Sequence, residues 1–115
     1  MANAYAPYSG FKVGAALLAC GRVFTGANVE NASYPATMCA ERVAVGSAVA
    51  AGCTDFQELV IVTEAASPAM PCGCCRQVLA EFNPALPLRS VAGDARRTVT
   101  LADIFPDPFV LPGDR

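Results

Sequence analysis

The sequence contains no histidine among its 115 residues. This absence excludes Ser-His and Cys-His nucleophile pairs, and every metal site that needs an imidazole ligand. Charged residues make up only 16% of the chain and the net charge is −2, so the sequence lacks the basic stripe that a polynucleotide partner requires. No apolar run approaches the roughly 18 residues needed to cross a membrane. We therefore expect neither a nucleic-acid partner nor a membrane span.

Apolar residues, by contrast, are abundant. They make up 54% of the chain, above the roughly 45–50% usual for a soluble domain. A chain of this length forms one domain, 1–115, and cannot bury so much apolar surface within itself, which favours an oligomer interface. The apolar stretch 13–19 lacks the charged start and the length of a signal peptide. It is interpreted as a strand, and the protein as cytoplasmic.

Six cysteines are present, at positions 20, 39, 53, 72, 74 and 75. An even number suits a disulfide framework, but such frameworks belong to short, loop-rich secreted chains. This chain has a long middle with helical periodicity, and Cys74 directly precedes Cys75. Free thiols are therefore the better interpretation.

The pattern of apolar and turn residues predicts an α/β domain. Strands are predicted at 11–19, 22–26, 58–63 and 86–92, with a weaker pattern at 98–101. Helices are predicted at 37–52 and 72–82, with a short helical turn at 101–105. Loops are predicted at 5–10, 27–38 and 68–71. The order β-β-α-β-α-β is typical of helices that cover a mixed sheet.

Two short motifs place cysteines at the starts of the two predicted helices: C-A-E beginning at Cys39 and C-G-C-C beginning at Cys72. Helix N-termini lower a thiol pKa and favour the thiolate that metals require. Cys72 and Cys75 share one face of a first turn, and Cys39 supplies a third sulfur. Three protein ligands leave one position of a zinc ion open for water, which is the catalytic pattern. Glu41 is suitably placed to take a proton from that water.

These thiols allow other interpretations. Cys72 and Cys75 alone would equally suit a redox dithiol, and Cys74 would close a structural four-cysteine site. The side chain of Cys74, however, points about 100° around the helix from Cys75. The full combination of C-A-E and P-C-x-x-C matches the recognised pattern of zinc deaminases, in which the glutamate is not a ligand.

Five motifs occur together in this chain: Tyr5-Ala-Pro-Tyr-Ser, Phe11-Lys-Val-Gly-Ala-Ala-Leu17, Asn28-Val-Glu-Asn-Ala-Ser-Tyr-Pro35, Cys39-Ala-Glu-Arg42 and Pro71-Cys-Gly-Cys-Cys-Arg-Gln77. In this order they resemble the small, homotetrameric cytidine deaminases over nearly the whole chain. The resemblance implies a three-layer α/β/α fold with a mixed five-stranded sheet. The helix that usually precedes the first motif in that family is expected to be absent.

The resemblance also implies an activity. It is the hydrolytic deamination of cytidine and 2′-deoxycytidine to uridine and 2′-deoxyuridine plus ammonia, a step of pyrimidine salvage. One zinc ion per subunit would be held by Cys39, Cys72 and Cys75. Glu41 would move the proton from water to N3 of cytosine and then assist the departure of ammonia.

For the substrate, the resemblance implies that Asn28 and Glu30 hold the ribose 3′-hydroxyl, an amide and a carboxylate suited to one hydroxyl group. Without the resemblance, the same two residues would pass for loop-forming polar residues. Phe11 would contact the base or the sugar, although a phenylalanine in a strand equally suits the core.

Neighbouring subunits complete each pocket in the family. Ala32 and Tyr34 would enter from one neighbour, and Phe109 would stack from another. Arg42 would donate hydrogen bonds to the thiolates and so restore positive character to a zinc ion that carries three negative ligands. Taken alone, Arg42 could also be an ordinary surface arginine.

Three rival functions remain at this stage. A deaminase of the same fold could act on another cytosine nucleoside such as blasticidin S, although the pair of Asn28 and Glu30 favours an ordinary ribose. The thiols could form a non-catalytic structural zinc module, or a zinc-free dithiol oxidoreductase. An enzyme that edits polynucleotides is disfavoured by the sequence pI near 4.9.

Overall fold

The computed structural model describes residues 1–111. Its strands are β1 (Val13–Ala19), β2 (Arg22–Ala27), β3 (Phe56–Thr63), β4 (Pro87–Ala92) and β5 (Ala95–Thr100). Its helices are α1 (Ala40–Ala50), α2 (Gly73–Ala80) and α3 (Leu101–Ile104), with a short 3-10 helix at Tyr34–Ala36. No helix within these residues is long and apolar enough to span a membrane.

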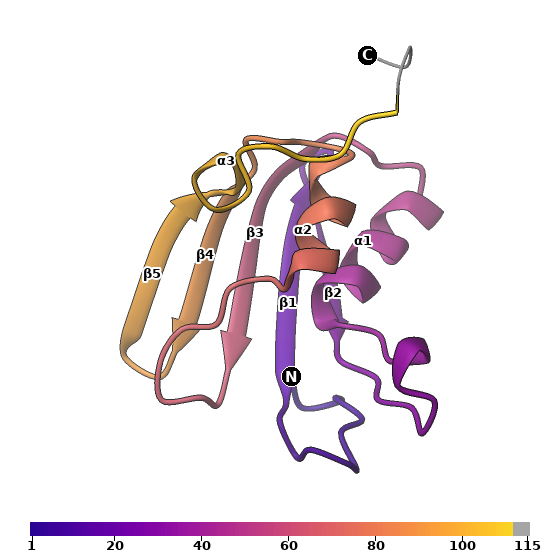
Figure 1. Cartoon of the computed structure of the whole chain (residues 1–115), viewed down its shortest axis with the longest axis vertical. Coiled ribbons are helices and arrows are strands. Elements are labelled where there is room, and N and C mark those ends of the chain that lie inside the picture. The colour runs from indigo at the N-terminus through magenta and orange to yellow at the C-terminus, as the bar shows by residue number, and fades with distance from the viewer. Residues whose placement is uncertain (112–115) are drawn as a thin grey trace.

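The five strands form one mixed sheet in the order β2-β1-β3-β4-β5 (Figure 1). β3 and β4 run parallel, and the other neighbouring strands are antiparallel. The mixed five-stranded sheet expected from the sequence is therefore confirmed. β5 is longer than predicted and begins at Ala95, because Gly93, with φ of +59°, closes a tight hairpin directly after β4.

α1 and α2 lie side by side on one face of the sheet (Figure 1). The hydrophobic core is packed between these two helices and the strands. Alternate strand residues fill this core, including Leu17, Leu59 and Ile61, which are at most 1% exposed. The opposite face carries half-buried apolar side chains such as Leu18 and Val60. No helix within residues 1–111 lies on that face in the way that the third layer of an α/β/α fold would.

Gly26 allows the first turn of α1 to lie directly on β2. A Cβ atom at this position would come within 2.6 Å of Ala44 N and closer still to the carbonyl oxygen of Ala40. Only a glycine permits so close an approach of helix and strand backbones. The same first turn carries Cys39 and Glu41, so Gly26 sets the depth at which these side chains sit.

We predict that Gly26→Ala lowers the free energy of unfolding by more than about 2 kcal/mol, because the added methyl group overlaps helix backbone that cannot move aside cheaply. Gly46→Ala, on the exposed side of α1 where a Cβ meets nothing within 4 Å, should raise it by about 0.5–1 kcal/mol. Urea denaturation measures both. Equal midpoints for the two variants would contradict the close approach at Gly26.

Candidate active site

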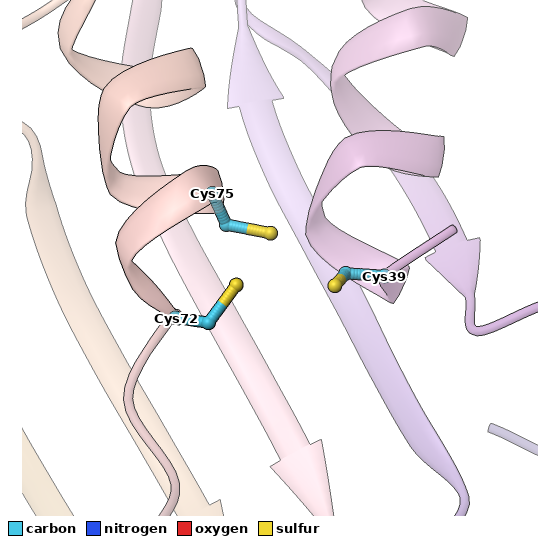
Figure 2. A group of neighbouring side chains, drawn as sticks. All are labelled: Cys39, Cys72 and Cys75. Carbon is cyan, nitrogen blue, oxygen red and sulfur yellow. The ribbon is translucent and has the colours of Figure 1, made fainter. Parts of the chain in front are cut away.

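Three thiols meet at the N-terminal ends of α1 and α2. Cys39 is the N-cap residue of α1, Cys72 is the N-cap residue of α2, and Cys75 lies in the first turn of α2. Their Sγ atoms all lie within 4.8 Å of one another, and the three side chains point toward a common centre (Figure 2). Cys74 is exposed and lies outside this group. The sequence therefore predicted correctly which three of the cysteines come together.

The thiols influence one another strongly. A hydrogen bond from Cys75, then one from Cys72 and the charge of Arg42, lower the pKa of Cys39 to about 5, although burial opposes this shift. The pKa of Cys75 is raised, first because its proton is shared with Cys39 and then because the residue is buried. If all three thiols were ionised, the thiolates would repel one another at this spacing.

The donor set fits a zinc ion. Sulfur is a preferred ligand of zinc, and a divalent cation offsets the repulsion that otherwise keeps Cys75 protonated. The two helix N-termini add partial positive charge that favours thiolates. Arg42 lies beside the group, where its Nη2 donates to the carbonyl oxygen of Thr37 at 2.7 Å and its charge acts on Cys39.

Glu41 follows Cys39 by two residues and is only 6% exposed. It lines a cavity of about 400 Å³ together with Cys39 and Cys72. Burial raises the pKa of its carboxyl group, and a negative charge on Cys39 adds to that effect. A carboxyl group with a raised pKa is thus held at the wall that also carries Cys39 and Cys72.

The cavity opens toward an outer hollow of about 610 Å³, with which it shares the lining residues Phe11, Glu30, Tyr34 and Thr37. Phe11 is 42% exposed, so it is a pocket wall and not the core phenylalanine that its strand pattern also allowed. Together the two spaces can hold a molecule that has one end at the thiols and the other near Glu30.

Asn28 and Glu30 both bind backbone at or just before the start of β1. The Asn28 amide accepts from Val13 N at 3.0 Å and donates to the Phe11 carbonyl oxygen at 2.8 Å. Glu30 Oε1 accepts from Tyr8 N at 2.9 Å and from Ser9 N at 3.1 Å. The loop-forming interpretation of this pair is thus correct for part of each side chain. Both nevertheless line the cavity and retain unused hydrogen-bonding positions.

The residues expected to act on neighbouring subunits are strongly exposed. Tyr34 is 85% exposed and Phe109 is 68% exposed, and Ala32 is exposed at the rim of the outer hollow. Phe109 lies away from the thiols of its own chain, beside a separate cavity of about 230 Å³ near Phe82. Within residues 1–111, none of the residues that line this separate cavity also lines the cavity of Cys39, Glu41 and Cys72.

Sequence reasoning missed two residues that shape these surroundings. Gln77 donates to the Phe109 carbonyl oxygen at 3.0 Å and accepts from Phe109 N at 3.1 Å, which fixes the C-terminal segment on α2. Ser9 hydrogen-bonds Glu30 through its side chain. Both stand within the motifs that carried the resemblance, but nothing local in the sequence indicates the partners, which are 32 and 21 residues away.

We predict one zinc ion per chain in protein purified without chelators, measured by plasma mass spectrometry. Cys75→Ser should retain less than about a tenth of that metal, because two remaining thiolates bind zinc far more weakly. Cys74→Ser, one position away but exposed, is the matched control and should keep the full amount. Equal metal loss in both variants would contradict the three-thiol group.

Known proteins resemble this chain in sequence and in fold. Residues 1–86 match the family described as the cytidine and deoxycytidylate deaminase zinc-binding region. The chain is 47% identical over 111 residues to a protein named cytidine deaminase from Sporosarcina psychrophila, an overlap of 93% of this chain and 81% of that one. A second protein of that name, from Halalkalibacterium halodurans, is 46% identical over 93% of this chain and 83% of its own length.

The crystal structure of cytidine deaminase from Burkholderia pseudomallei is similar to this fold with a TM-score of 0.89 at 47% identity, covering 94% of this chain and 89% of that chain. The one from Mycobacterium tuberculosis gives a TM-score of 0.82 at 45% identity, covering 96% of this chain and 88% of that chain. These similarities confirm the family that the five sequence motifs resemble. With its three thiols at two helix starts, the chain belongs to the cytidine and deoxycytidylate deaminase family.

Proposed function

We propose that this protein is a zinc-dependent hydrolase that deaminates cytidine and 2′-deoxycytidine to the uracil nucleosides and ammonia. Cys39, Cys72 and Cys75 would hold the ion. The observation that carries the proposal is a buried Glu41 in the same cavity as the clustered thiols. The names of the similar proteins, all cytidine deaminases, supply the substrate.

Zinc, when bound, supplies a Lewis acid that makes water acidic enough to lose a proton near neutral pH. Glu41 does the proton transfer. Its carboxylate accepts one proton of the attacking water and delivers it to N3 of the cytosine ring as the oxygen bonds to C4. It then takes the remaining proton from the new C4 hydroxyl group and passes it to the amine, which leaves as ammonia when the C4–N bond breaks and the C4 carbonyl forms. Because Glu41 is 6% exposed, bulk water does not compete for these protons.

The sugar would be held at the other end of the cavity. After its two backbone contacts, the Asn28 amide retains one hydrogen and one acceptor position, and Glu30 retains one acceptor position on Oε2. A single hydroxyl group, which both donates and accepts, complements this pair. The 3′-hydroxyl is common to cytidine and 2′-deoxycytidine, which suits activity on both, with Phe11 against the base or sugar.

We further propose a cytoplasmic homotetramer built from one deaminase domain per chain, 1–115. Ala32 and Tyr34 would complete a neighbour's pocket, and Phe109 would stack in that of another. The support is the exposure of these side chains together with the half-buried apolar face of the sheet. A soluble chain rarely leaves so many large apolar side chains open unless a partner covers them.

We predict that the protein releases ammonia from cytidine, with loss of the cytosine absorbance, and that Glu41→Gln lowers kcat by at least about 10³-fold while zinc content is unchanged. Glu64→Gln, an exposed glutamate after β3, is the matched control and should retain full activity. Blasticidin S is assayed in parallel.

If the protein deaminates blasticidin S and not cytidine, the proposed substrate is wrong. Zinc without turnover of either compound would favour a structural module. Full activity in the Glu41 variant would remove that residue from the proton transfer.

We predict that light scattering gives a mass four times that of the chain, and that Phe109→Ala raises KM for cytidine about tenfold, because a base–aromatic stack is lost. Val110→Ala, at the next position of the same segment and also exposed, should leave KM unchanged. An active monomer with an unaltered KM in the Phe109 variant would contradict the shared pocket.

A further inference from the structure

Ser9 lies at the centre of the hydrogen bonds that surround Glu30. Its Oγ donates to Glu30 Oε2, and it accepts from Phe11 N at 3.0 Å. A hydroxyl group has one hydrogen to give. An ionised carboxylate can only accept, so the Ser9 hydrogen is directed at Glu30, while the Phe11 N–H occupies one of the two acceptor positions of the Ser9 oxygen. The hydroxyl group thus links the Glu30 carboxylate to the backbone of Phe11.

The bonds to Glu30 leave little of the carboxylate unused. An ionised carboxylate has about four acceptor positions. Tyr8 N and Ser9 N fill the two positions of Oε1, and the Ser9 hydroxyl fills one of Oε2. The remaining acceptor position belongs to Oε2. The hydrogen bond from the Ser9 hydroxyl to this oxygen restricts the rotation of the carboxylate group. Glu30 also lines the cavity, so this position is available to a ligand there.

We propose that Ser9 is a positioning residue for the nucleoside sugar: its hydroxyl orients the Glu30 carboxylate so that the last acceptor position receives the 3′-hydroxyl. This inference rests on the proposed function, because it assumes a nucleoside in the cavity. Ser9 itself need not contact the substrate.

The charge state of Glu30 agrees with this role. The Ser9 hydroxyl, together with the backbone amides, holds the pKa of the Glu30 carboxyl below its ordinary value. The carboxylate is then ionised at neutral pH and can only accept, which suits a hydroxyl donor.

The loop keeps other attachments when the Ser9 hydroxyl is removed. Tyr5 N donates to the Asn28 carbonyl oxygen at 2.9 Å, and Glu30 N donates to the Tyr5 carbonyl oxygen at 2.8 Å. The Asn28 side chain fixes Phe11 and Val13 independently. Ser9→Ala also removes the acceptor of the exposed Phe11 N–H. The variant is nevertheless expected to fold with an unchanged melting temperature and a complete cavity, in which the Glu30 carboxylate has lost its orientation.

The test compares cytidine with 3′-deoxycytidine, which lacks only the hydroxyl group in question. For Ser9→Ala, kcat/KM on cytidine should fall about tenfold, mostly through KM, because a charge-assisted hydrogen bond is weakened. On 3′-deoxycytidine it should fall less than about twofold. Ser9→Thr, which keeps the hydroxyl, should restore cytidine activity. Ser47→Ala, on the exposed side of α1, is the control and should change neither substrate.

Each outcome separates the possibilities. An equal loss on both nucleosides would mean that Ser9 only supports the loop, and no loss on either would mean that it does nothing for the sugar. Both results overturn the inference while wild-type turnover of cytidine leaves the proposed function intact. Failure of the wild-type protein to deaminate cytidine would overturn the proposed function, and the role of Ser9 with it.

Discussion

The electrostatics of three sulfurs gathered into a small volume govern the rest of this structure. Cys39, Cys72 and Cys75 come within 4.8 Å of one another only because two helices begin at the same end of the sheet. Thiolates at that spacing repel one another, so the cluster is stable in its charged form only with a cation between them. The close approach of α1 to β2 at Gly26 is the packing feature that makes this arrangement possible.

The pocket wall is built differently, from side chains that hold backbone. Asn28 and Glu30 each use some of their hydrogen-bonding positions to hold the backbone at and before the start of β1. The same two residues line the cavity and retain unused hydrogen-bonding positions. In such a site, the side chains that would bind the ligand also hold the backbone of the pocket wall. Ser9 contributes to both, because its hydroxyl group bonds the Glu30 carboxylate and the backbone N–H of Phe11.

Much of this could be predicted from the sequence, because the relevant signals are local. β3 follows from a run of β-branched residues and β1 from a short apolar run, and the cysteine spacing places three thiols at helix starts. The predicted helix at 37–52 nevertheless begins only at Ala40, because Met38 pairs with Val29 through two backbone hydrogen bonds that no local pattern reveals. The contact between Gln77 and Phe109 joins distant segments in the same way. Side-chain bonds to distant backbone depend on the finished fold, and so they escape sequence reasoning.

The most direct test of this account is X-ray absorption at the zinc edge of the purified protein. Three sulfur neighbours at about 2.3 Å and one lighter atom in the remaining position would agree with a reactive centre that keeps one site for water. Four sulfur neighbours would mean a closed structural site and would contradict the account. So would metal-free protein in which these three sulfurs are oxidised to disulfides.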